Sequence, residues 1–209
     1  MRVLELFKGS GSVTKYYLDK PDVEVISLDI LKKYKPTIVA DIMDWDYKKY
    51  EPGYFDIIWA SPECKVFSSL QHTNIGRKWK DMAHLNQVRS ENAHFINRTI
   101  DIIKYLNPKK YFIENPKNSA IWKYVEDKEF LKKDVIVDYC YFGYVYKKPT
   151  RILTNGNYEN KRCGHKNHRV RLGINNKTMF GKGIDGINDT SNLMQRYSIP
   201  PRLLEYLLG

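Results

Sequence analysis

The chain of 209 residues is 42% hydrophobic and 13% aromatic, which excludes a disordered protein and predicts one domain with a full core. Its formal net charge of +11 favours a polyanionic partner, with nucleic acid ahead of an anionic membrane surface. No apolar run is long enough to cross a membrane. A strand pattern begins at Arg2, so we expect no signal peptide. Three scattered cysteines argue against a disulfide framework and favour a reducing compartment.

The first predicted element is a short apolar strand over residues 2–7. It is followed by the turn Lys8-Gly9-Ser10-Gly11-Ser12 and a helical pattern from Val13 to Leu18. Glycines between a first strand and a helix let the backbone approach a ligand closely and aim helix N–H groups at it. The spacing is not Gly-x-Gly-x-x-Gly, so it does not specifically indicate the pyrophosphate of a dinucleotide. The alternative is a tight turn that simply needs glycine.

The second and third predicted strands both lead into a carboxylate. Residues 23–28 end in Asp29-Ile30, and residues 37–42 end in Asp41-Ile42. An acidic residue at the end of the second strand is where an α/β nucleotide-binding fold holds a ribose. The alternative for each aspartate is a turn or a helix cap. Together with the glycine turn, the two carboxylates favour a cofactor with an adenosine-like part.

A buried central strand is predicted over residues 55–60, an apolar run rich in β-branched and aromatic residues. It breaks at Ser61-Pro62, because proline cannot donate to a sheet ladder. Cys64 lies just past the break, where open α/β sheets bind ligands, so its thiol is a candidate nucleophile. The alternative is a cysteine that is merely packed as a small hydrophobic residue.

After Cys64 the chain is polar and charged through Lys80, which suits a loop over the site. Apolar residues at helical spacing then predict one long helix over residues 81–106. The next strand, over residues 110–114, ends in Glu114-Asn115-Pro116, and a partly buried glutamate there is a candidate general acid. A structural turn glutamate is the alternative.

The last predicted elements are strands over residues 135–141 and 152–154 and a helix from Pro200 through Leu208. Between them, residues 156–189 are rich in glycine, asparagine, lysine and arginine and have little periodicity. We therefore expect an α/β fold with a mostly parallel, Rossmann-like sheet and helices on both faces. Its expected parts are a core over 1–155, a small basic insert over 156–190, and a C-terminal helix over 191–209 that returns to the core.

The order of these motifs resembles the motif series of the cytosine-5 DNA methyltransferases, above all the compact members of phages and large viruses. The resemblance rests on residues 5–11, Asp29-Ile30, Asp41-Ile42, residues 61–64, residues 114–116 and residues 195–208. It spans nearly the whole chain, and the cysteine and Glu-Asn motifs are fairly specific together. It implies the methyltransferase fold, S-adenosylmethionine as cofactor, and double-stranded DNA as partner. We expect the protein to be a monomer, although a partner protein is not excluded. We expect it in the cytoplasm or at the nucleoid, where the cell can be one that a phage or virus has infected.

The resemblance also implies residue roles. Cys64 would attack C6 of a flipped-out cytosine, and Glu114 would hydrogen-bond the N3/N4 edge of that base. Phe7 and Ile30 would pack on the adenine of the cofactor, with Asp29 on the ribose. The full set of implied cofactor residues is Phe7, Gly9, Gly11, Asp29, Ile30, Asp41, Ile42 and Pro62.

Two departures from the family pattern stand out. The usual Pro-Pro-Cys-Gln is Pro62-Glu63-Cys64-Lys65 here, so that Lys65 could lower the pKa of the thiol while Glu63 would oppose it. Residues 146–151 replace the family's Gln-x-Arg-x-Arg stretch, and residues 147–171 form a basic segment suited to phosphates. The expected nucleic-acid contacts are Lys65, Ser68, Lys148, Arg151, Arg162, Arg169 and Arg171.

Three alternatives remain at this point. One is a methyltransferase or other thiol enzyme that acts on RNA cytosine or on a nucleotide. Another is a nucleic-acid-binding protein in which a methyltransferase fold has lost its activity. The third is zinc bound by Cys163, His165 and His168, but a structural zinc site needs four ligands, so we expect no metal.

Overall fold

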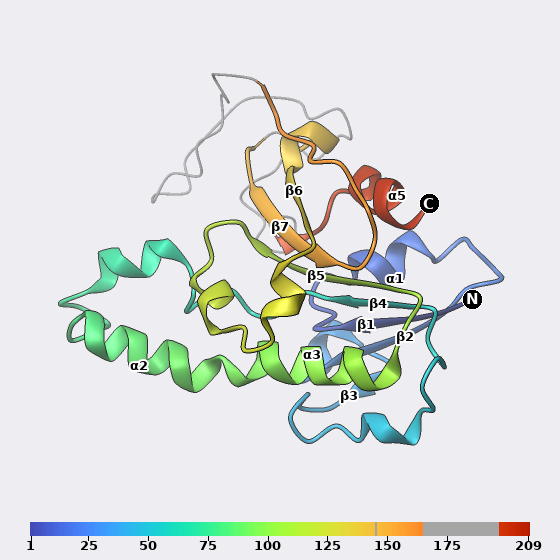
Figure 1. Cartoon of the computed structure of the whole chain (residues 1–209), viewed down its shortest axis with the longest axis horizontal. Coiled ribbons are helices and arrows are strands. Elements are labelled where there is room, and N and C mark those ends of the chain that lie inside the picture. Colours follow the sequence, from blue (N-terminus) through green and yellow to red (C-terminus); the bar gives the residue numbers. More distant parts are fainter. Residues whose placement is uncertain (145, 165–196) are drawn as a thin grey trace.

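The computed structural model describes residues 1–144, 146–164 and 197–209. Its centre is a seven-stranded sheet with the order β3-β2-β1-β4-β5-β7-β6 (Figure 1). The strands are β1 (Arg2–Leu6), β2 (Glu24–Asp29), β3 (Ile38–Val39), β4 (Ile57–Ala60), β5 (Lys110–Pro116), β6 (Asp134–Asp138) and β7 (Pro149–Thr154). All neighbours pair in parallel except β7, which is antiparallel to both β5 and β6. The expectation of a mostly parallel, Rossmann-like sheet is therefore confirmed.

The strand register places several strand ends at one edge of the sheet. Leu6 at the end of β1 lies opposite both Leu28 of β2 and Ala60 of β4, and Ala60 lies opposite Ile113 of β5. The strand order reverses between β1 and β4, which is where open α/β sheets form a crevice for ligands. The loops that follow these four strands therefore meet at the same place.

Helices cover both faces of the sheet, as expected (Figure 1). On one face, α3 (His94–Leu106) buries Ile96, Ile100 and Ile103 in a core with Leu4 and Ile58. On the other, α1 (Ser12–Tyr16) and α5 (Pro201–Leu208) contact each other over a second core. Alternate residues of the strands enter the two cores, because side chains of a strand point to opposite faces in turn. No helix among the described residues is long and apolar enough to cross a membrane.

The single helix predicted over residues 81–106 is wrong, because the segment forms two helices, α2 (Met82–Asn92) and α3, separated at Ala93. The amide of Ala93 bonds to the carbonyl of Ser90, three residues back, so the α-helical ladder is interrupted there. The two helices also face different surroundings. α3 follows the apolar core, whereas α2 buries only Leu85 and Arg89, so the two segments do not continue one apolar stripe.

Several strand boundaries also differ from the sequence prediction. β1 ends at Leu6, since Phe7 adopts a positive φ of 57° and leaves the strand. The third strand is confined to Ile38–Val39, because the chain turns at Asp41, whose carbonyl accepts the amides of Asp44 and Trp45. β6 stops at Asp138, and a 3-10 helix, η6 (Tyr139–Phe142), takes the residues expected to extend it.

Candidate active site

A pocket of about 350 Å³ opens at the edge where β1, β2, β4 and β5 end. Segments at the ends of these four strands, and the residue before β7, contribute to its wall, which includes Phe7, Gly9, Asp29, Ile30, Pro62, Cys64, Lys65, Glu114 and Lys148. These residues are far apart in the sequence, and they meet because parallel strands present their carboxyl ends to one edge. The structure thus brings the candidate nucleophile, the candidate acid and most of the expected cofactor residues into one cavity.

Asp29 organises the side of the pocket next to the glycine turn. One carboxylate oxygen, Oδ2, accepts the amide of Gly9 at 2.9 Å, and the other, Oδ1, accepts the amide of Leu31 at 2.8 Å. Gly9 has a φ of +47°, in the left-handed region that favours glycine, so the turn requires this residue type. The end of β2 is thereby tied to the loop after β1, with exposed Ile30 beside it.

Three expected cofactor residues do not line this pocket: Gly11, Asp41 and Ile42. Gly11 adopts a φ of +67° just before α1. The carboxylate of Asp41 accepts the amide of Met43 at 2.9 Å, within the turn after β3. Ile42 is 3% exposed and belongs to the hydrophobic core. A contact of these residues with a cofactor stays a prediction.

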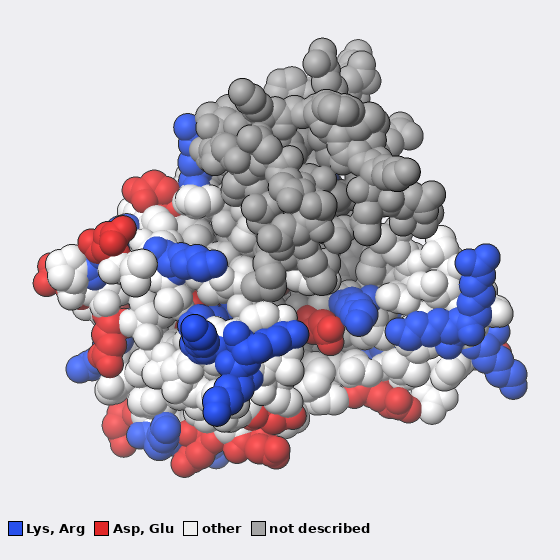
Figure 2. Space-filling view, turned by 180° about the vertical axis from the view of Figure 1, so that it is seen from behind, with Lys and Arg blue, Asp and Glu red and all other residues white. Residues whose placement is uncertain are grey.

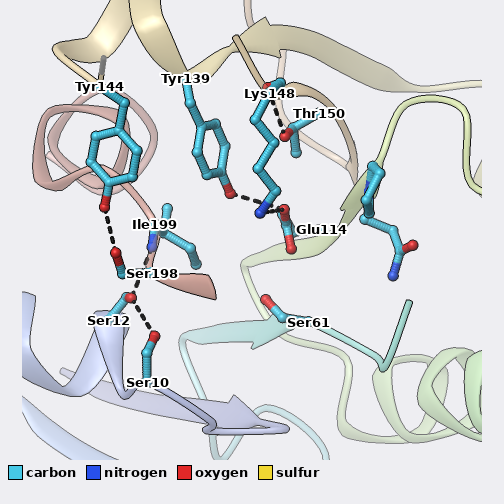
Figure 3. Close-up of polar contacts among 12 residues, drawn as sticks. Ser10, Ser12, Ser61, Glu114, Tyr139, Tyr144, Lys148, Thr150, Ser198 and Ile199 are labelled. Atoms are coloured by element: carbon cyan, nitrogen blue, oxygen red, sulfur yellow. Dashed lines mark hydrogen bonds and ion pairs between the residues drawn. The ribbon is translucent and has the colours of Figure 1, made fainter. Parts of the chain in front are cut away.

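The C-terminal segment reaches the same pocket from the other end of the chain. Tyr197 and Ile199 line it, and the amide of Ile199 donates to Oγ of Ser12 at 2.9 Å (Figure 3). Next to this contact, α5 buries Leu203, Leu204 and Leu207 under the sheet. Residues 195 and 196, which the sequence interpretation included in this motif, lie outside the described part of the chain.

Cys64 is half-buried in the loop after β4. Burial raises the pKa of its thiol, and the negative charges of Glu114 and Glu63 raise it further, while the ammonium of Lys148 lowers it. The main support for the thiolate therefore comes from Lys148, in a distant part of the chain, whereas the role suggested for the neighbouring Lys65 stays a prediction. Glu63 acts as expected.

Glu114, at the end of β5, is 7% exposed and holds a defined position. Its Oε1 accepts the hydroxyl of Tyr139 at 2.9 Å and lies 3.6 Å from Nζ of Lys148 (Figure 3). The following residue, Asn115, donates from Nδ2 to the carbonyl oxygen of Pro62 at 2.8 Å. The end of β5, which carries Glu114, and the loop that carries Cys64 are thus connected directly by a buried hydrogen bond.

The loop after Cys64 is held by residues that the sequence interpretation did not select. The guanidinium of Arg89, 4% exposed on α2, donates to the carbonyl oxygens of Val66 and Ser68 at 3.0 and 3.1 Å. Gln71 donates to the carbonyl of Lys65 at 2.9 Å, and its Oε1 accepts the indole N–H of Trp79 at 2.9 Å. Tyr139 was missed because the strand predicted through residue 141 made it one more core aromatic.

The expected nucleic-acid contacts occupy different settings. Lys65 is exposed at the pocket, while Ser68 caps the 3-10 helix η3 (Ser69–Asn74) by accepting the amide of Leu70 at 3.2 Å. Arg151 pairs with Asp134, and Arg162 donates to buried Asp138 at 2.9 Å. Arg169 and Arg171 lie outside the described residues.

On the face shown in Figure 2, lysine and arginine side chains predominate across the middle, and acidic ones gather along the lower edge.

The expectation of no metal site is not tested by the structure. Cys163 and Cys140 are joined by a side-chain hydrogen bond, and burial, this bond and the charge of nearby groups raise the pKa of Cys140 to about 12. His165 and His168 lie outside the described residues. Within the described ranges, no group of three or more metal-ligating side chains is assembled.

A mostly parallel sheet with a reversed seventh strand, and a pocket at the point where the strand order switches, define a Rossmann-like α/β protein of the methyltransferase class. No protein-family model matches the sequence. A protein of Frog virus 3 (isolate Goorha) named "Probable DNA (cytosine-5)-methyltransferase" is 30% identical over 219 residues, which cover 100% of this chain and 99% of that protein. The chain therefore belongs to the DNA (cytosine-5)-methyltransferase family, and the resemblance seen in its motifs is confirmed.

Two solved structures share the fold at lower sequence identity. The methyltransferase EhMeth of Entamoeba histolytica has a TM-score of 0.52 and 19% identity, over 77% of this chain and 56% of that one. A mutant of Spodoptera frugiperda DNMT2 has a TM-score of 0.50 and 18% identity, over 78% of this chain and 55% of that one. The chain thus spans little more than half the length of these two proteins.

Proposed function

We propose that this protein methylates C5 of cytosine in double-stranded DNA, with S-adenosylmethionine as the methyl donor and Cys64 as the covalent nucleophile. The observation that carries the proposal is the placement of Cys64 and Glu114 in one pocket, at the ends of the adjacent parallel strands β4 and β5. A thiol and a carboxyl group on one cavity wall can act on two positions of the same base.

The residues present fit S-adenosylmethionine. The left-handed Gly9 keeps the turn after β1 free of side-chain bulk, so the backbone can approach the methionine end. The carboxylate of Asp29 retains lone pairs beyond its two backbone contacts and can accept ribose hydroxyls. Phe7 and Ile30 offer apolar surface to an adenine. When bound there, the cofactor supplies an electrophilic methyl group.

The base enters the same pocket from outside the stack, since C6 of cytosine is inaccessible within a duplex. The thiolate of Cys64 forms a bond to C6, and the electron pair of the C5–C6 double bond moves toward C4. The pair of the C4–N3 double bond then moves to N3, which takes a proton from Glu114. C5 becomes electron-rich and would take the methyl group, with S-adenosylhomocysteine as the leaving group. Water then takes the C5 proton, and the pair of the C5–H bond re-forms the C5–C6 double bond and expels the sulfur of Cys64 as a thiolate. N3 returns its proton to Glu114, which restores the ring.

Lys148 supports the first of these steps through its charge. It lies at the pocket 3.6 Å from Oε1 of Glu114, and it lowers the pKa of the Cys64 thiol. An ammonium in this position favours the thiolate before attack. It also faces the glutamate that is left negative once N3 has taken the proton.

The test is transfer of labelled methyl groups from S-adenosylmethionine to duplex DNA, compared with RNA and with free cytidine nucleotides. We expect transfer to the duplex, and sequencing of the methylated positions would give the target. Cys64→Ser should bind S-adenosylmethionine normally and transfer nothing, because a hydroxyl is a far poorer nucleophile than a thiolate at neutral pH. A covalent complex of the wild type with 5-fluorocytosine DNA is also expected. Full turnover in Cys64→Ser would refute the mechanism.

A further inference from the structure

Tyr139 reaches Glu114 from beyond the end of β6, a strand that is not adjacent to β5. It is the first residue of η6, directly after β6, and the sheet order places β7 between β6 and β5. The side chain is completely buried, and its hydroxyl donates to Oε1 of Glu114 at 2.9 Å. A buried tyrosine hydroxyl normally finds a partner, and here that partner is the candidate acid itself.

Lys148 approaches the same carboxylate oxygen. Its Nζ lies 3.6 Å from Oε1 of Glu114 and 4.4 Å from the centre of the Tyr139 ring, so one cation contacts both residues. The backbone amide of Tyr139 also donates to the carbonyl of Lys148 at 3.2 Å, which holds the two residues in register. Among the described residues, the polar contacts of Glu114 therefore gather on Oε1. Figure 3 shows the other oxygen pointing away from Tyr139, on the side where Ser61 lies.

The hydroxyl of Tyr139 is a permanent donor. Burial raises its pKa well above the ordinary value, and the charge of Glu114 and the hydrogen bond to it act in the same direction. Tyr139 thus keeps its proton at neutral pH. An oxygen that accepts this proton and faces an ammonium is a poor place for a second proton.

We infer that Tyr139 is a positioning residue that reserves Oε1 of Glu114 as an acceptor, so that Oε2 is the oxygen that faces the target base and that bears the proton when the carboxyl group donates one to the base. The inference rests on the proposed function and deepens it. As the bond between sulfur and C6 forms, N3 of cytosine takes the proton from Oε2. Glu114 is then left as a carboxylate, still bound by Tyr139 and Lys148.

The variant Tyr139→Phe tests this inference, because it removes one oxygen atom and keeps the ring in the core and under Lys148. We expect kcat on cytosine DNA to fall by about 10- to 100-fold, the loss typical of a hydrogen bond to a charged group. The KM for S-adenosylmethionine should stay unchanged. Tyr158→Phe is the matched control, since it removes a tyrosine hydrogen bond of equal length, 2.9 Å to the carbonyl of Leu207, away from the pocket. Thermal unfolding of both variants verifies that they fold.

A second target base separates a positioning role from a merely structural one. Pyrimidin-2-one lacks the electron-donating amino group of cytosine, so its C6 accepts a thiolate with less help from protonation of N3. The rate of covalent adduct formation should therefore fall less in Tyr139→Phe on this base than on cytosine. An equal fall on both bases, or no fall on either, would overturn the inference. If instead the wild type itself transferred no methyl group and formed no adduct, the proposed function would fail.

Discussion

The side-chain amide of Asn115 donates to the carbonyl oxygen of Pro62 at 2.8 Å, and this one bond joins the end of β5, which carries Glu114, to the loop that carries Cys64. Strand pairing fixes Glu114 within β5, but it does not fix the loop that leaves the end of β4. The distance between nucleophile and acid therefore depends on this contact. Asn115 is 1% exposed, so water cannot replace the bond.

We predict that Asn115→Ala lowers kcat by at least tenfold and the free energy of unfolding by about 1–3 kcal/mol, because the carbonyl of Pro62 is left buried without a donor. Asn155→Ala is the control. Asn155 bonds the backbone of Tyr111 and Lys109 at the opposite end of β5, and should cost stability without a change in kcat. Methyl-transfer kinetics and urea unfolding measure both quantities. If Asn115→Ala retained full kcat, the loop that carries Cys64 would be positioned independently of this bond.

The pKa of Cys64 predicts two opposite shifts in thiol reactivity. Because that pKa is raised, the thiolate is scarce at neutral pH, and alkylation by iodoacetamide should accelerate as the pH rises. Glu114→Gln removes a charge that raises the pKa, so its alkylation profile should move to lower pH. Lys148→Met removes a charge that lowers the pKa, so its profile should move to higher pH.

The Glu114→Gln variant should thus have a more reactive thiol but slower methyl transfer. We expect the rate of methyl transfer to fall by a factor on the order of 100, because the amide cannot donate a proton to N3 as an acid does. Lys65→Met serves as the control for Lys148→Met, and we expect a smaller shift from it, because Lys65 is adjacent to Cys64 in the sequence but exposed to solvent, which screens its charge. A profile that moved in the same direction in Glu114→Gln and Lys148→Met would contradict the charge arrangement described above.

The contact between Ser12 and Ile199 predicts a role for the C-terminal segment in cofactor binding. Deletion from Ser198 onward removes α5 with its buried leucines, and should lower both stability and affinity for S-adenosylmethionine. Ser12→Ala removes the acceptor of the Ile199 amide together with the hydrogen bond between Ser12 and Ser10, and should weaken cofactor binding by at least about fivefold, the effect of one hydrogen bond. Calorimetric titration measures both. Unchanged affinity in the truncated protein would refute the closing role.

The ion pairs predict which cations contact DNA phosphates. Each lost phosphate contact lowers the slope of log affinity against log salt by about 0.9. Lys65→Ala, at the exposed rim of the pocket, should show this change. Arg162→Ala should mainly lower stability, because Arg162 is engaged with buried Asp138. Binding of duplex DNA at several salt concentrations, together with thermal unfolding, distinguishes them. A larger slope change in Arg162→Ala would show that this arginine leaves Asp138 to bind DNA.

The sequence by itself determined the sheet-based fold class and the main candidates for the site. Cys64 and Glu114 stood out because a polar residue just past a buried strand must lie at the edge where parallel strands end. Asp29 and Gly9 stood out for the same reason. These are local signals, in which the strand and the residue that follows it are neighbours in the chain.

Only the tertiary structure decided which residues surround Cys64 and Glu114. Tyr139 reaches Glu114 from η6, just after β6, and Lys148 reaches it from the residue before β7, while Arg89 holds the loop after Cys64 from a separate helix. The fold also pairs Arg151 with Asp134 and Arg162 with Asp138. The number of charges in the basic segment could not show that these two arginines are already paired. The pKa of a thiol depends on the charges near it in space, and packing brings Lys148 close while Lys65 remains exposed to solvent.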